Sequence, residues 1–179
     1  MTEAAFERPP PIHITLATAR AIECNGCGDC CDSRRTDGYW TWGSLPGDQF
    51  ADLNDGSPLI IPLERVDGGG WRDRSVRPED ESELFPTSFR CAAFEPQEDG
   101  RGLCGHHDRE RPGRCGEYPV HVPYLEPELE EHGEVTLSTR EFPRCSWYRM
   151  VVVRDDDPRA VELADLEGSL ALPGSEARV

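Results

Sequence analysis

Apolar and polar positions alternate over two segments of the chain, which is the pattern of strands with one buried face. Ile12, Ile14 and Leu16 alternate with His13, Thr15 and Ala17, so we expect a strand there. Residues 135–139 alternate in the same way, and residues 148–153 form a further run with strand composition. We expect these last two segments to pair as a hairpin whose connection carries Cys145.

Weaker patterns predict three further elements. Residues 59–63 have the composition of a short strand, which Pro62 should confine to a sheet edge. A short helix is expected over residues 46–53, and one or two helical turns between Cys104 and Pro119. Between them, residues 68–83 contain a glycine triplet and an acidic run, so we expect a long surface loop.

The C-terminal part of the chain predicts a short amphipathic helix after three consecutive aspartates. Asp157 would be its N-cap and Pro158 its first residue, with Leu163, Leu166 and Leu170 on one face. The chain therefore divides into a leader with the first strand (1–20), a cysteine-cluster metal-binding domain (21–150) and an acidic tail with a short helix (151–179). The expected fold class is a small, loop-rich α+β domain with short strands and a few short helices.

Composition indicates that an apolar core alone cannot organise this fold. Only 36% of the 179 residues are hydrophobic, while 17 are glycine and 16 are proline. Buried apolar surface is therefore a small source of stability. Eight cysteines can supply the missing order by crosslinking loops through disulfides or through metal.

Charge and terminal sequence limit the class of protein. The N-terminus lacks the apolar run of a secretory signal, and no stretch is long and apolar enough for a membrane span. We therefore expect a cytoplasmic protein, in which cysteines stay reduced and clusters of them bind metal. The net charge of −16 argues against nucleic acid as a partner.

Four cysteines within eight residues are the strongest signal in the sequence. Cys24, Cys27, Cys30 and Cys31 follow a Cys-x2-Cys-x2-Cys-Cys pattern, in which each two-residue spacing lets two sulfurs converge on one centre. If the backbone is extended at Cys30 and Cys31, their side chains point to opposite faces and can serve different centres.

The second half of the chain contributes the other candidate ligands, which are Cys91, Cys104, Cys115 and Cys145. They complete two four-thiolate sites, or one cluster with a second, partly open centre. His106 and His107 can supply a nitrogen ligand, although eight thiolates make this unnecessary. Several arginines lie close to the cysteines, where they either stabilise thiolates or pair with the many carboxylates: Arg34, Arg35, Arg90, Arg109, Arg111, Arg114 and Arg144.

Thiolate ligands suit both an iron–sulfur cluster and Zn2+. Three cysteines at two-residue spacing with a distant fourth match the ligand arrangement of bacterial ferredoxins, which favours an iron–sulfur cluster. Glycine next to Cys27 is typical of a zinc knuckle, so zinc stays the alternative cofactor.

These residues resemble a bacterial family of CxxCxxCC cysteine-cluster proteins, described as a zinc- or iron-chelating domain, whose relatives include flagellin N-methylase. The resemblance covers the first four cysteines, Cys91 with Phe94, Cys104, Arg111-Pro112, Cys115 with Pro119, and Cys145. It implies metal chelation through the cysteines. It also allows methyl transfer to protein lysines, although no site for S-adenosylmethionine is visible in the sequence.

Three functions are compatible with these features. The first is a metal-binding protein with a redox or metal-handling role. The second is a structural zinc module that binds a protein partner, and the third is a metal-dependent or methyl-transferring enzyme. The sequence leaves open whether the protein is an enzyme.

Overall fold

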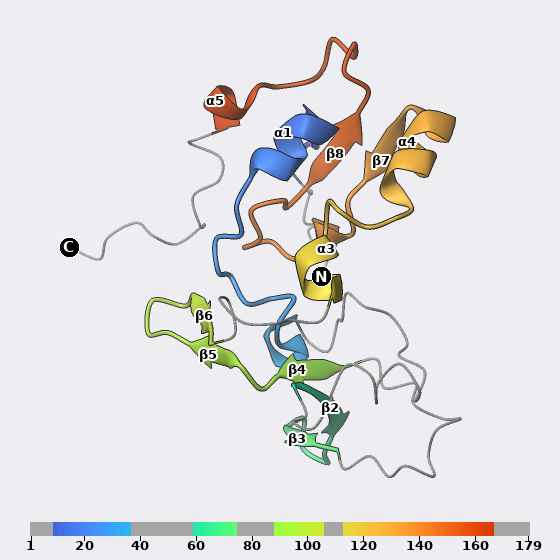
Figure 1. Cartoon of the computed structure of the whole chain (residues 1–179). Helices are drawn as coiled ribbons and strands as arrows, with labels where there is room; N and C mark the ends of the chain where they lie inside the picture. The colour runs from blue at the N-terminus through green and yellow to red at the C-terminus, as the bar shows by residue number, and fades with distance from the viewer. Residues whose placement is uncertain (1–8, 37–58, 75–87, 106–112, 167–179) are drawn as a thin grey trace, which may run out of the picture.

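The computed structural model describes residues 9–36, 59–74, 88–105 and 113–166 (Figure 1). Short helices and short strands alternate in this part of the chain, so the α+β prediction is confirmed. Figure 1 shows two regions one above the other. The upper region contains the main sheet with its helices, and the lower region consists of small hairpins.

The main sheet joins the two ends of the described chain. Strand β1 (Ile12–Thr15) pairs in parallel with β8 (Met150–Val153), which pairs antiparallel with β7 (Glu134–Thr136). This confirms the predicted first strand and the predicted hairpin, whose connection carries Cys145. All four residues of β8 are buried, as expected for the central strand of a covered sheet.

Helices α1 (Leu16–Ala21) and α4 (Leu125–His132) contact this sheet and close its apolar core. Thr15 caps α1 by accepting a hydrogen bond from the Thr18 amide. Gly133 ends α4 in the left-handed conformation, with φ of 79°. The core cluster consists of Ile14, Ala19, Ile22, Val120, Leu125, Val135, Leu137, Trp147, Met150, Val152 and Leu166.

The lower region contains two small antiparallel sheets. One has the order β3–β2–β4, from β2 (Ile60–Arg65), β3 (Trp71–Asp73) and β4 (Phe89–Cys91). The other is the hairpin of β5 (Phe94–Pro96) and β6 (Gly102–Cys104).

The predicted edge position of Pro62 is wrong, because β2 is the middle strand. The Pro62 carbonyl accepts a hydrogen bond from the Arg74 amide at 2.8 Å, so the proline nitrogen also faces the β3 side. The β2–β3 register ends at Leu63, so the missing N–H lies just beyond the paired residues. The long loop expected over residues 68–83 is also wrong at its start, since Val66 to Gly70 form a tight turn into β3.

Helix α3 (Gly113–Glu117) lies within the segment from Cys104 to Pro119, where one or two helical turns were predicted. Two 3-10 turns span Ser33–Thr36 and Ser138–Glu141. The predicted C-terminal helix begins later than expected. Asp157 binds the amide and guanidinium of Arg159 in a turn, and the Val161 amide donates to the His13 carbonyl. This contact holds the chain along β1, so α5 spans only Leu163–Leu166.

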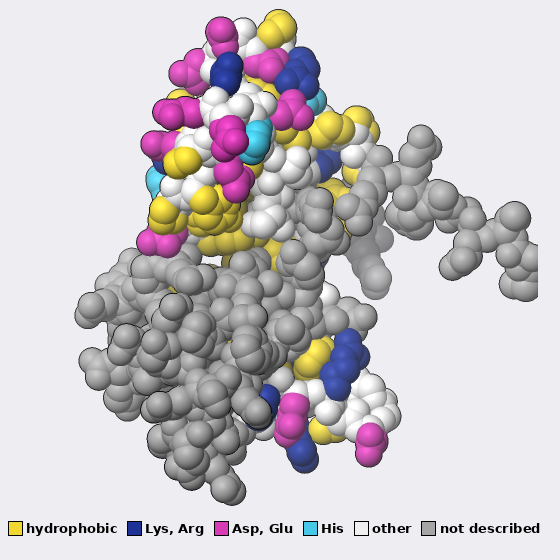
Figure 2. All heavy atoms as spheres, turned by 90° about the vertical axis from the view of Figure 1, so that its right-hand side faces the viewer, with side chains coloured by type: hydrophobic (Ala, Val, Ile, Leu, Met, Phe, Trp, Pro, Cys, Tyr) yellow, Lys and Arg dark blue, Asp and Glu magenta, His cyan; other side chains and the backbone are white. Residues whose placement is uncertain are grey.

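Some predictions lie outside the described residues, namely the helix over 46–53, the acidic run 79–83 and the tail residue Leu170. Within the described segments, no helix has the length and apolar character needed to cross a bilayer. Figure 2 shows acidic side chains over the upper part of the molecule, where α4 exposes Glu126, Glu128, Glu130 and Glu131.

Candidate metal centre

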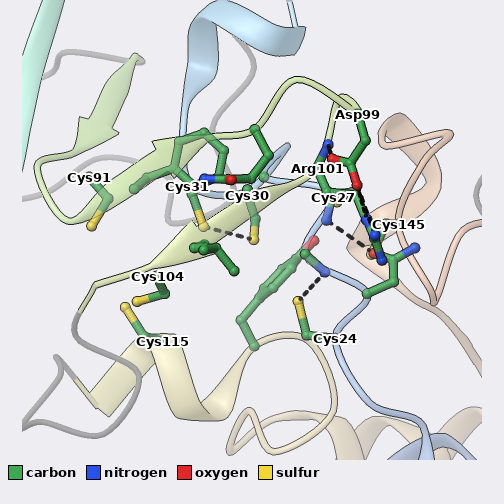
Figure 3. A pocket seen from close by; sticks show the side chains of 18 of the residues that line it. Cys24, Cys27, Cys30, Cys31, Cys91, Asp99, Arg101, Cys104, Cys115 and Cys145 are labelled. Carbon is green, nitrogen blue, oxygen red and sulfur yellow. Dashed lines mark hydrogen bonds and ion pairs between the residues drawn. The ribbon is translucent and has the colours of Figure 1, made fainter.

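All eight cysteines line one cavity of about 990 Å³ between the upper and lower regions (Figure 3). They come from the loop after α1, from β4 and β6, from α3, and from the turn before β8. None of the eight takes part in a disulfide. The fold therefore brings together at one cavity every residue that the sequence nominated as a thiolate ligand.

The loop over residues 24–31 wraps around its own sulfur atoms. Gly26 and Gly28 have φ of 70° and 77°, a conformation that glycine adopts without strain. The turns direct backbone amides at sulfur, from Gly26 to Cys24 Sγ at 3.4 Å and from Asp29 to Cys27 Sγ at 3.5 Å. Amides that donate to sulfur stabilise the thiolate form, as a metal ligand requires.

The remote Cys145 is attached to this loop through both of its neighbours. The Asn25 side chain donates to the Arg144 carbonyl at 2.8 Å, and the Asn25 amide donates to Ser146 Oγ at 3.0 Å. Ser146 Oγ in turn donates to the Glu23 carbonyl at 2.8 Å. These bonds fix the position of Cys145 beside the loop of residues 24–31.

A buried carboxylate strengthens the same attachment. Asp29, whose side chain is only 2% exposed, forms an ion pair with Arg144 and lies 3.7 Å from Arg35 Nε. The pKa of Asp29 lies above its ordinary value because burial outweighs the opposite effect of the two guanidinium groups. Because a buried carboxylate is costly without a partner, this pair couples the loop to the segment that carries Cys145.

The lower hairpins position the other cysteines. The Cys91 amide donates to the Cys31 carbonyl at 2.7 Å, and the Phe89 amide donates to the buried Ser33 hydroxyl at 2.9 Å. The amide of Gly102, the first residue of β6, donates to the Gly26 carbonyl at 2.7 Å. Strands β4 and β6 are thus both hydrogen-bonded to the segment that carries Cys24, Cys27, Cys30 and Cys31.

The Phe94 ring packs against two glycines that join the loop to β6. A Cβ atom added at Gly28 or Gly102 would overlap this ring. Arg35 lies over the same ring, 5.6 Å from its centroid. Phe94 is therefore a spacer that sets the distance between the loop of residues 24–31 and the β5–β6 hairpin.

Gly102→Ala is expected to lower the free energy of unfolding by about 2 kcal/mol, because overpacking of this kind costs ~1–3 kcal/mol. Combining it with Phe94→Leu should cost less than the sum of the two single changes, because the smaller side chain relieves the overlap. Urea denaturation of the four proteins measures this coupling. Gly116→Ala is the matched control, since an added Cβ there meets nothing within 4 Å. Strict additivity of the two changes would contradict the spacer role.

The thiols differ in their readiness to bind metal. A hydrogen bond from the Cys145 thiol lowers the pKa of Cys27, and the Asp29 amide and the Arg144 charge act in the same direction. The same contact and burial raise the pKa of Cys145. A hydrogen bond with Cys31 and burial raise the pKa of Cys30, and burial raises the pKa of Cys91 to about 11. Metal binding at these thiols must therefore release protons.

The arginines near the cysteines are paired with carboxylates. Arg34 binds Asp32 at 2.5 Å, and Arg90 binds Asp73 at 2.6 Å. Arg144 also acts on a thiol, because its charge contributes to the lowered pKa of Cys27. The side chains of Arg109, Arg111 and Arg114, together with His106 and His107, lie outside the part of the chain that the structure describes.

The sulfurs surround the cavity without converging at a single point. Among the described residues, no three histidine, cysteine, aspartate or glutamate side chains are arranged to hold one metal ion. A mononuclear four-thiolate site with bonds of about 2.3 Å needs its sulfurs ~3.8 Å apart. Cys30 and Cys31 approach this spacing, with 3.9 Å between their sulfur atoms.

Sequence reasoning did not identify three residues that hold the cysteines in place. They are Asn25, Asp29 and Ser146, each next to a cysteine and each bonded across the cavity wall. Their position beside cysteines was a visible signal, but their partners became clear only from the fold.

Comparisons with protein families, with curated proteins and with solved structures find no match to this chain. The resemblance to the CxxCxxCC family therefore rests on the cysteine spacing and the motif residues quoted with it.

Proposed function

We propose that this protein binds a thiophilic metal centre, an iron–sulfur cluster or zinc, through its clustered cysteines, and that it has a redox or metal-handling role. The observation that carries this proposal is that all eight cysteines line one cavity, although they are spread from residue 24 to residue 145. Eight isolated core cysteines would have no reason to share one cavity wall.

The chemistry of the cavity wall fits a metal better than it fits free thiols. Backbone amides already donate to Cys24 and Cys27, and the Arg144 charge favours the Cys27 thiolate. The raised pKa values of Cys30 and Cys91 show that further thiolates there need a compensating positive charge. A metal cation supplies that charge.

The sequence spacing of the cysteines and the size of the cavity favour an iron–sulfur cluster over a single zinc ion. In a four-iron cluster each thiolate binds a different iron atom, so the ligands can stand apart around a wide cavity. Cys24, Cys27 and Cys30 have the ferredoxin-like spacing in the sequence, and all eight cysteines line one wide cavity. Zinc is the alternative, and binding it requires the cavity to contract around one ion.

Alkylation of the cysteines, mapped by mass spectrometry, tests the proposal in a protein purified without air. We expect Cys24, the exposed cysteine, to be protected in the native protein and all eight to react after chelation in denaturant. A free thiol at Cys24 would react at once. Disulfides would stay unmodified in denaturant without reductant, and either result contradicts metal binding.

A metal-dependent enzyme is a second candidate, favoured by the size of the cavity. At about 990 Å³ it is as large as sites that hold small molecules, which span ~300–1,000 Å³. Its wall also includes the polar turn between β5 and β6, with Gln97, Glu98, Asp99 and Arg101. An open coordination position at the metal would support this candidate over a closed structural site that serves protein binding.

The proposed metal chemistry suits a reducing compartment, and we propose the cytoplasm as the location. There, glutathione and thioredoxin keep thiols available to metal. The acidic surface of α4 in Figure 2 is consistent with a protein partner and is unsuited to nucleic acid.

A further inference from the structure

The contacts among the cysteines fall into two sets. In the first set, Figure 3 shows Cys27 and Cys145 together on the side of the cavity away from Cys91. Cys24 and Cys27 also contribute to the raised pKa of Cys30, after the larger effect of its neighbour Cys31. The bonds from Asn25 and Asp29 to the segment around Cys145 hold these four residues together: Cys24, Cys27, Cys30 and Cys145.

The second set lies on the side of the cavity formed by the lower hairpins and α3. The Cys91 amide donates a hydrogen bond to the Cys31 carbonyl at 2.7 Å. Figure 3 shows the side chains of Cys104 and Cys115 pointing toward one another, with Cys91 on the same side of the cavity. The members of this set are Cys31, Cys91, Cys104 and Cys115.

Cys30 and Cys31 are the point at which the two sets meet. The sequence favoured opposite orientations for an extended backbone, but the chain turns here, since the Cys31 and Asp32 amides both donate to the Gly28 carbonyl at 3.1 Å. The two sulfurs consequently lie 3.9 Å apart, and Figure 3 shows Cys31 on the side of Cys91 and Cys30 on the side of Cys24. Two centres built on these sets would be direct neighbours.

We propose that the cavity holds two adjoining four-thiolate centres, one on Cys24, Cys27, Cys30 and Cys145 and the other on Cys31, Cys91, Cys104 and Cys115. This inference rests on the proposed metal-binding function and adds its stoichiometry and its ligand sets. Each centre takes the ligand number of a four-cysteine zinc site or of a four-cysteine iron–sulfur cluster. The first is built mainly by one loop, and the second by elements that are separate in sequence.

The matched variants Cys145→Ser and Cys91→Ser test this division, because each removes one ligand from one set. Metal content per chain is measured on protein purified without air. Each single variant is expected to keep half of the wild-type metal, and the double variant almost none. Loss of all metal in either single variant would show one shared centre and overturn the proposal. Full metal content in either variant would exclude that cysteine as a ligand and also overturn it.

Partial metal removal from the wild-type protein gives the same test without a substitution. After half of the metal has been chelated, alkylation should yield molecules with four modified cysteines, which belong to one set or the other. Molecules with either none or eight modified would show one cooperative centre and overturn the division. A wild-type protein that holds no metal would instead contradict the proposed function itself, so the two failures are distinct.

Discussion

Removal of the proposed metal is expected to expose the backbone amides of β4, β5 and β6 to hydrogen exchange while those of β8 stay protected. The apolar core cluster belongs to the upper region, and the lower strands bury little beyond Ile60, Leu63 and Phe89. Structural metal sites contribute ~10–16 kcal/mol to folding, so protection of the lower strands should fall at least about 100-fold. Hydrogen exchange read by mass spectrometry, with and without chelator, measures the change by segment.

The central strand is the internal control for this experiment. Val152 is fully buried and pairs with both β1 and β7, so its amide should respond little to the chelator. Unchanged protection over residues 89–104 would mean that the hairpins fold without metal. An equal loss of protection over β8 would instead mean that the whole fold depends on the metal.

Asp29→Ala is expected to lower the free energy of unfolding by about 2 kcal/mol. Removing one member of a buried ion pair costs ~3–5 kcal/mol, and the partial exposure of Arg144, 33% for its side chain, reduces this figure. The same change frees the segment around Cys145, and altering a group that orients metal ligands costs about 10- to 100-fold in metal affinity. Urea denaturation and competition with a chelator measure the two effects.

Glu64→Ala is the matched control for Asp29→Ala. It also removes a carboxylate paired with an arginine, but the Glu64–Arg72 pair is exposed at the surface. The control should change stability by less than about 0.5 kcal/mol and leave metal affinity unaltered. If both variants behave alike, Asp29 does not couple the loop to Cys145.

The main sheet could be predicted from sequence because its strands carry their own signal. Alternation at Ile12 and Ile14 and the apolar run of β8 specify strands whatever their partners are. The parallel pairing of β1 with β8 could not be predicted, since it joins segments far apart in the chain. Helix α4 was missed, although Leu125, Leu129 and the terminating Gly133 carry a helical pattern.

Local sequence was misleading where a tertiary contact decides the conformation. Pro62 was assigned to an edge on propensity, yet its nitrogen faces the side of β2 where the pairing with β3 has ended. Asp157 is a residue type typical of N-caps, but it binds Arg159, and the following chain forms a turn before the Val161 amide donates to the His13 carbonyl. Both errors come from partners that a single sequence does not show.

The candidate ligands could be nominated from cysteine spacing, whereas their grouping required the fold. Spacing alone placed Cys24, Cys27 and Cys30 together. The contact of Cys145 with Cys27 depends on the bonds of Asn25, Asp29 and Ser146, which no spacing rule indicates.

The most direct test of the central claim is elemental analysis of protein freshly purified without air, combined with its absorption spectrum. We expect iron and sulfide in stoichiometric amount with absorption near 400 nm, or stoichiometric zinc in a colourless sample. A folded protein that contains neither metal would contradict the claim that these eight cysteines form a metal centre.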